Sequence, residues 1–181
     1  MQLANAQAKD LWRTIGAHCS SRHSIAPWRV QSHAAILLGD HEVTGSAVHF
    51  QTGDDRSSWT VQMTTADGRL IMLNIEFEHE RYDRDEEQQP IHQHQPVKAT
   101  VIEAWSRRLR DAAALDILSA QSARDAFQQP VFDRVDVGEL RLKFNDGASV
   151  ALVCDQTAMY DPDEKSRADV FVAAIREHSG L

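Results

Sequence analysis

A glycine turn between two alternating segments constrains the fold of this chain more than any other feature of its sequence. Asp67-Gly68 separates Trp59–Thr65 from Arg69–Phe77. In the first segment the apolar residues Trp59, Val61 and Met63 alternate with Thr60, Gln62 and Thr64. Asp-Gly between such segments predicts a type I′ hairpin, since both central residues of that turn need a positive φ angle. The alternation predicts a sheet with one buried face.

A second tight turn repeats this pattern near the C-terminus. Asn145-Asp146-Gly147 separates Glu139–Phe144 from a return strand at Ser149–Cys154. Further strands are expected at Ala34–Leu38, Val43–Phe50 and Phe132–Val137. Because hairpins impose antiparallel pairing, the pattern predicts an α+β fold whose antiparallel sheet is built from two hairpin regions.

Helices are expected to flank this sheet. Apolar residues at three-and-four spacing predict an N-terminal helix at Asn5–His18, a long central helix at Val97–Leu118 and a C-terminal helix from Pro162 to His178. Asp161 is the expected N-cap of the last helix, and Gly180 lies just beyond its end. A further short helix is expected at Ser119–Gln128, and Trp28, which follows Pro27, is expected in extended chain.

Length and composition predict one cytoplasmic domain over residues 1–181. The chain has 181 residues, of which 42% are hydrophobic, and this suits a single compact domain. No apolar stretch is long enough to cross a membrane, and the N-terminus lacks the apolar core of a signal peptide. Cys19 and Cys154 are expected as buried free thiols.

The charge of the chain favours some partners over others. The formal net charge is −8, which disfavours binding to nucleic acid and suits a basic protein partner. The sequence contains no Gly-x-Gly-x-x-Gly, P-loop, Gly-x-Ser-x-Gly, Cys-x-x-Cys or His-Glu-x-x-His motif. Dinucleotide enzymes, P-loop NTPases, serine hydrolases of the common type and zinc ribbons are therefore disfavoured.

A polar loop at about 78–96 carries the main functional hypothesis. It is rich in acidic residues and histidine and almost free of apolar residues. We expect a non-enzymatic protein that acts through protein–protein interaction, as inhibitors and immunity proteins do, and that needs no cofactor. The expected binding residues are Glu80, Asp83, Asp85, Glu86, Glu87 and Trp28.

The alternative hypothesis is a small metal-dependent enzyme. In an extended segment, His92 and His94 would present both imidazoles on one side, and Glu76 and Glu78 share a strand face for the same reason. Two imidazoles with one or two carboxylates suit Zn²⁺ or Mn²⁺.

Two features of the expected central helix leave further alternatives open. Arg107, Arg108 and Arg110 would lie in one turn, either as a solvated face or as a clamp for phosphate or carboxylate. The apolar stripe of Val97–Leu118 could serve as an interface, so self-association is a third possibility.

Overall fold

The fold is built around a four-stranded antiparallel sheet. The computed structural model describes residues 5–21, 24–124, 129–155 and 161–181. The strands of the main sheet pair in chain order, and they are β3 (Val43–Thr52), β4 (Ser57–Thr65), β5 (Arg69–Phe77) and β6 (Ala99–Arg108).

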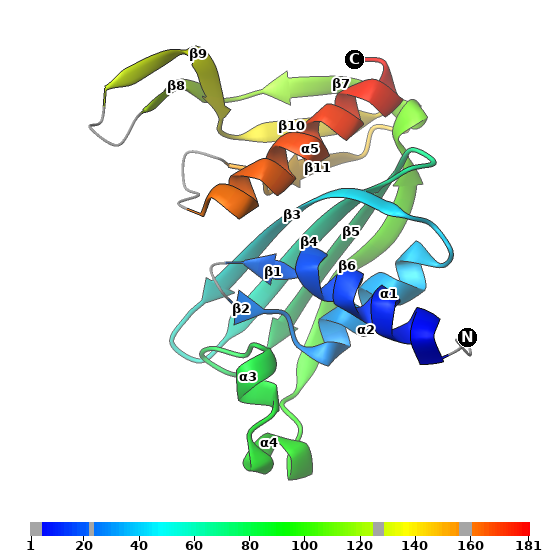
Figure 1. The fold of residues 1–181 in the computed structure, drawn as a ribbon, viewed down its shortest axis with the longest axis vertical. Helices are drawn as coiled ribbons and strands as arrows, with labels where there is room; N and C mark the ends of the chain where they lie inside the picture. The colour runs from blue at the N-terminus through cyan, green and yellow to red at the C-terminus, as the bar shows by residue number, and fades with distance from the viewer. Residues whose placement is uncertain (1–4, 22–23, 125–128, 156–160) are drawn as a thin grey trace.

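A second antiparallel sheet of three strands packs across one face of the first (Figure 1). Its strands, in the order β11-β10-β7, are β7 (Ala112–Ile117), β10 (Leu140–Phe144) and β11 (Ser149–Leu152). Two short hairpins complete the strands, and they are β1 (Ser20–Ser21) with β2 (Ser24–Ile25), and β8 (Ala120–Arg124) with β9 (Pro130–Val137).

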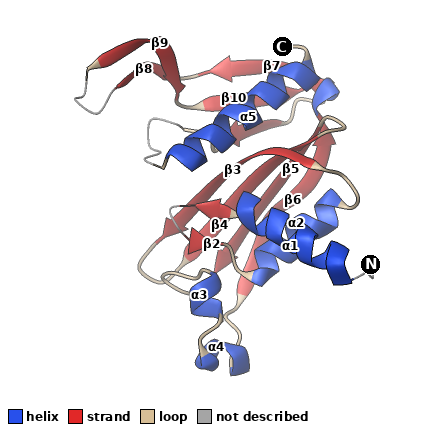
Figure 2. Ribbon diagram, in the orientation of Figure 1, coloured by secondary structure: helices blue, strands red, loops and turns tan. Residues whose placement is uncertain are grey.

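Helices cover both faces of the main sheet (Figures 1 and 2). Those described are α1 (Asn5–His18), α2 (Trp28–Leu38), α3 (Arg84–Glu87), α4 (Pro90–His94), α5 (Pro162–Ser179) and a 3₁₀ turn, η1 (Leu109–Asp111). Within the described ranges, none of these helices has the length and apolarity needed to cross a membrane.

The two faces of the main sheet support two hydrophobic cores. On one face, α1 and α2 pack against the odd-numbered residues of β4 and β5, among them Trp59, Val61 and Ile75. On the other face, α5 and the three-stranded sheet pack against Leu70 and Met72. The sequence predicted one buried face, but the face carrying Gln62 and Thr64 is buried as well, because α5 and the second sheet cover it.

Gln62 joins the two sheets although its side chain is polar. Its Nε2 donates to the backbone carbonyl of Ala151 at 2.8 Å, and its Oε1 accepts from the backbone N–H of Val153 at 2.9 Å. A fully buried side-chain amide needs hydrogen-bond partners, and both the nitrogen and the oxygen of the Gln62 amide have one. Gln62 therefore ties the edge strand β11 to the centre of the main sheet.

The α+β class and the antiparallel pairing are confirmed. Both expected hairpins are present, but they belong to two separate sheets and not to one. The turns differ from the expected type I′ geometry. Gly68 N–H donates to Thr65 O and Gly147 N–H to Phe144 O, so the glycine follows the turn in each case rather than occupying its centre. Both glycines have a positive φ, 77° and 85°, which is the arrangement of a three-residue hairpin loop.

The expected long helix at Val97–Leu118 is wrong, because this segment forms β6, η1 and β7. β6 contains a bulge, since Ile75 pairs with Val101 while Asn74 pairs with Glu103, which leaves Ile102 as the extra residue. The bulge interrupts the two-residue alternation of the strand. The apolar residues consequently fall at three-and-four spacing, as they would in a helix.

Three shorter predictions are also wrong. Ala34–Leu38 and Trp28 belong to the helix α2, whose buried residues Val30, Ala34 and Leu38 are spaced as on one helical face. The expected helix at Ser119–Gln128 is replaced by the strand β8 over its described part, and residues 125–128 lie outside the described ranges.

Both terminal helices are confirmed. α1 spans the expected Asn5–His18, and α5 begins after Asp161, whose carboxylate accepts from the N–H of Asp163. α5 ends at Ser179 and is capped by Gly180, which has a φ of 71°. The cap residues thus set the bounds of α5 as the sequence predicted.

Gly45 allows α5 to approach the main sheet. A Cβ at Gly45 would lie 2.7 Å from both the Cα and the backbone N of Phe171, a fully buried residue of α5. Backbone atoms on a packed helix cannot move aside without displacing the helix.

We therefore predict that Gly45→Ala lowers the free energy of unfolding by about 1–3 kcal/mol through overpacking. Gly16→Ala in α1 is the control, because its Cβ would make an ordinary contact of 3.7 Å with Gln31. Urea denaturation of the two variants measures the difference. Equal stability of both variants would contradict the close approach of α5.

Candidate metal centre

The segment that follows β5 is folded onto the main sheet rather than forming a free loop. Trp59 Nε1 donates to the carbonyl of Tyr82 at 2.8 Å, and the N–H of Tyr82 donates to Ser57 Oγ at 3.0 Å. Tyr82 is buried, and its ring lies 4.9 Å from that of Phe77. These contacts hold the start of the 78–96 segment against the end of the sheet.

Asp83 begins α3 and anchors it. Its Oδ1 accepts from the backbone N–H groups of Asp85 and Glu86 at 3.1 and 3.0 Å, as an N-cap does. Its Oδ2 accepts from Ser24 Oγ at 3.0 Å. Only 6% of Asp83 is exposed, so these hydrogen bonds replace those that its carboxylate would make with water.

Trp28 holds the other side of α3. The backbone N–H of Trp28 donates to Glu87 Oε2 at 2.7 Å, and the guanidinium of Arg84 lies 3.7 Å from the centroid of the Trp28 ring. The Trp28 ring also meets Trp12 of α1 edge-on at 5.3 Å. Residues far apart in the sequence thus fix the orientation of this helix of four residues.

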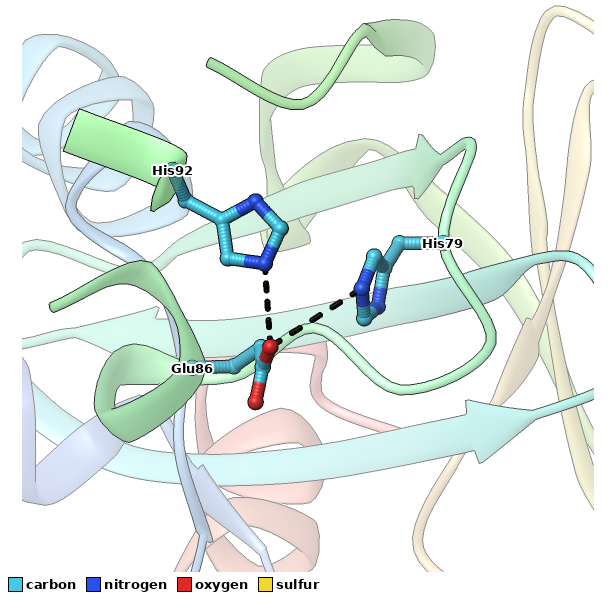
Figure 3. Close-up of side chains that lie close together, drawn as sticks. All are labelled: His79, Glu86 and His92. Carbon is cyan, nitrogen blue, oxygen red and sulfur yellow. Dashed lines mark hydrogen bonds and ion pairs between the residues drawn. The ribbon is translucent and has the colours of Figure 1, made fainter. Parts of the chain in front are cut away.

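Two histidines and a glutamate converge on one point beside α3 (Figure 3). Glu86 Oε1 lies 3.0 Å from His92 Nε2 and 3.9 Å from His79 Nε2. His79 follows β5, Glu86 lies on α3 and His92 lies on α4. One ligand atom from each residue lies within 4.8 Å of the other two.

The backbone orients the His79 ring. His79 Nδ1 lies 3.0 Å from the carbonyl oxygen of Arg81 and can donate a hydrogen bond to it. A proton held on Nδ1 leaves the lone pair on Nε2, the atom that faces Glu86. Histidine ligands of metals are commonly oriented by such a hydrogen bond from the second ring nitrogen.

Aromatic packing confines the two imidazoles. The rings of His79 and His92 meet edge-on at 5.1 Å, and each lies within 6 Å of the Tyr82 ring, at 5.7 and 5.8 Å. Burial, and after it the charges of Glu87 and Glu86, raise the pKa of Tyr82.

The donor set and its exposure suit a transition metal with an open coordination position. Two imidazole nitrogens and one carboxylate oxygen form a three-ligand set of the kind found at catalytic zinc sites. The side chains are 14% exposed for His92, 32% for His79 and 35% for Glu86. Solvent can therefore reach a fourth position. Tetrahedral bonds of about 2.0–2.2 Å would require Glu86 Oε1 and His92 Nε2 to move slightly apart from 3.0 Å and His79 Nε2 to move closer than 3.9 Å.

Of the four metal ligands expected from the sequence, the structure places only His92 in the group of three. The 92–94 segment is helical, so the expectation that it is extended is wrong, and residues two apart on a helix do not face each other. His92 joins the group, while His94 is exposed and stands apart. The other two expected ligands form ion pairs instead, Glu76 with Arg56 at 2.7 Å and Glu78 with Lys98.

His79 was missed as a ligand from sequence. It is thirteen residues from His92, and the two meet only because α3 and α4 fold back beside the end of β5. No regular spacing encodes this arrangement. The one available signal was the concentration of histidine and acidic residues between 76 and 94.

The acidic residues expected to bind a partner differ in their accessibility. Asp83, Glu86 and Glu87 are engaged in the contacts described above. Glu80 and Asp85 are exposed. The acidic surface that this segment offers to a partner is therefore smaller than its sequence suggests.

The two cysteines are buried and free, as expected, and lie apart from the metal centre. Burial raises the pKa of both thiols to about 12. Since the thiolate is the form that attacks electrophiles and binds metals, neither residue is suited to these roles. Cys19 lies in the core beneath α1 and α2, and Cys154 lies in the core beneath α5.

Comparison with known proteins leaves the site to be interpreted from its own geometry. No protein-family model, no curated protein and no solved structure matches the chain.

We predict that Asp83→Ala loosens α3 and with it the Glu86 side chain. Loss of the cap and of the Ser24 contact is expected to cost about 1–3 kcal/mol and to speed amide hydrogen exchange in residues 84–94. Asp85→Ala is the control, since Asp85 is exposed and should cost less than about 0.5 kcal/mol. Unchanged exchange in Asp83→Ala would show that the cap does not hold this segment.

Proposed function

We propose that this protein binds a divalent transition metal, Zn²⁺ in preference to Mn²⁺, through His79, Glu86 and His92. The observation that carries the proposal is the approach of both imidazoles to Glu86 Oε1, with His92 Nε2 at 3.0 Å and His79 Nε2 at 3.9 Å. The backbone hydrogen bond to His79 Nδ1 supports it, because that bond aims Nε2 at the same point.

The choice of ion follows from the donor atoms. Imidazole nitrogen suits zinc, copper, nickel and iron, whereas manganese and magnesium favour sites made mainly of carboxylate, carbonyl and water oxygens. Two of the three donors here are imidazoles. The general order of divalent-ion affinities also places Zn²⁺ above Mn²⁺.

The bound ion would supply a Lewis acid, and the protein's own residues would orient it. Three protein ligands leave a fourth position of a tetrahedral ion for water or for another ligand. The partial exposure of Glu86 and His79 makes that position accessible. An ion held by His79, Glu86 and His92 would lower the pKa of a water in that position, and the chemistry it would supply is hydrolytic.

The ion would also join three separate parts of the chain. His79 extends from the main sheet, whereas Glu86 and His92 belong to two short helices that follow it. Metal binding would tie α3 and α4 to the end of β5, and the binding free energy would add to the stability of this segment.

We predict that Zn²⁺ binds with one-to-one stoichiometry and that His92→Ala weakens it about a hundredfold or more. The loss should exceed the roughly 10–100-fold cost of removing a group that only orients a ligand. Isothermal titration calorimetry measures the affinity. Because protons compete for the ligand atoms, the affinity should fall as the pH is lowered.

His94→Ala is the matched control, since His94 lies on the same helix but outside the group of three. It should bind Zn²⁺ within about twofold of the unmodified protein, because it loses none of the ligand atoms. Equal loss in His92→Ala and His94→Ala, or tighter binding of Mn²⁺ than of Zn²⁺, would overturn the proposal.

A further inference from the structure

A cavity lined by arginines lies at the opposite end of the main sheet from the metal centre. Arg69 at the start of β5 pairs with Arg108 at the end of β6, whereas Phe77 and Ala99 pair at the other end, next to His79. About 27 Å of extended strand separates the two ends. The cavity is therefore remote from the metal centre.

The cavity concentrates positive charge in an acidic protein. It has a volume of about 500 Å³ and is lined by Arg69, Arg107 and Arg108, with Ser106 and the Asn145-Asp146 turn beside them. The net charge of the chain is −8, yet three arginines line this cavity. Cavities of about 300–1,000 Å³ are typical of small-molecule sites.

Two aspartates in the cavity lining offset part of this positive charge. Asp146 accepts from Arg107 Nη1 at 2.7 Å and from the backbone N–H of Ala148 at 3.0 Å, and these two hydrogen bonds lower its pKa. Asp111, the second aspartate of the lining, is neighboured by Arg110 at 4.0 Å. The cavity lining thus contains three arginines and two aspartates, a local excess of one positive charge.

The arginines are oriented with donors to spare. Arg107 lies 5.0 Å from the centroid of the Phe144 ring and is held there by Asp146. Arg69 donates its Nε to Asp67 at 3.0 Å, and its two terminal nitrogens remain for a ligand. The guanidinium of Arg108 has no ion pair or hydrogen bond with any residue in the described ranges.

A buried hydroxyl in the cavity wall also lacks a partner. Ser106 Oγ is inaccessible to solvent and has no hydrogen-bond partner among the residues that the structure describes. Buried polar groups in folded proteins are nearly always paired. A ligand oxygen in the cavity would accept from this hydroxyl after a small adjustment of the wall.

We propose that this cavity binds a small molecule through a phosphoryl group. Arg69 and Arg108 would donate to the phosphoryl oxygens, and Ser106 Oγ would donate to another. Guanidinium groups bind phosphate through paired hydrogen bonds, and a phosphoryl group has more acceptor oxygens than a carboxylate for three converging donors. The volume exceeds that of a bare phosphate ion, which leaves space for the organic part of a phosphate monoester.

The experiment titrates the full chain with inorganic phosphate and with glycerol 3-phosphate at constant ionic strength, followed by NMR of the backbone amides. We expect saturable binding that shifts the amides of Arg69 and of residues 145–148, and not those of 79–94. Arg108→Gln should weaken binding about tenfold, as the loss of a charge-assisted hydrogen bond would. Tighter binding of the ester identifies an organic phosphate as the ligand, and equal binding identifies free phosphate.

Two further variants separate a built site from general electrostatic attraction. Arg110→Gln removes a neighbouring exposed charge that does not line the cavity, and it should change the affinity less than twofold. Ser106→Ala should weaken binding several-fold without lowering the melting temperature, because the hydroxyl has no partner within the described ranges to lose. Absence of saturable binding, or equal weakening by Arg108→Gln and Arg110→Gln, would overturn the proposal.

Discussion

The register of the β4–β5 hairpin is the constraint on which the rest of the molecule depends. Because side chains alternate along a strand, a slip of one residue would exchange the apolar set of Trp59 and Val61 with the polar set of Thr60 and Gln62. Each set has its own partners, α1 and α2 on one face, and α5 with the second sheet on the other. Neither layer could pack if the register changed.

Gln62 illustrates how a polar residue can be part of such a core. Its amide is buried between the sheets, where an unpaired amide would cost about 1–3 kcal/mol. Hydrogen bonds to the backbone of Ala151 in β11 and of Val153 just after it remove that cost and place the second sheet at a defined position. Gly45 allows α5 to pack closely against the main sheet, because glycine has no Cβ at this contact.

The metal centre depends on the same hairpin through a short chain of contacts. Trp59 of β4 holds Tyr82 by its indole N–H, Tyr82 precedes the capping residue Asp83, and Asp83 begins the helix that carries Glu86. His79 is placed by the end of β5 itself. The ligand group is thus positioned by the sheet, although two of its members lie on helices of only four and five residues.

Local sequence signals predicted the elements whose bounds are set by turn and cap residues. The Asp-Gly turns identified both hairpins, and Asp161 and Gly180 identified the ends of α5. The β6 strand was not predictable in this way, because the bulge at Ile102 gave a strand the apolar spacing of a helix. Conversely, the run of apolar residues at the end of α2, Ala34–Leu38, suggested a strand where the chain forms a helix.

The candidate metal site was predictable only in its composition. The sequence pointed to the right segment and to His92, but it paired His92 with His94, a neighbour in the chain. The true neighbours, His79 and Glu86, are brought there by a fold-back of the chain that leaves no periodic signal. The arginine cavity was not predictable from spacing either, since Arg69 and Arg108 become neighbours only through the pairing of β5 with β6.

Anomalous diffraction at the zinc absorption edge, from crystals grown with Zn²⁺, tests the central claim most directly. The account predicts one zinc peak bonded at about 2.0–2.2 Å to His79 Nε2, His92 Nε2 and a Glu86 carboxylate oxygen, with water or a small ligand in the remaining position. The absence of a zinc peak at these three side chains would contradict the account. Zinc bound at His94 while the three side chains remain without metal would also contradict it.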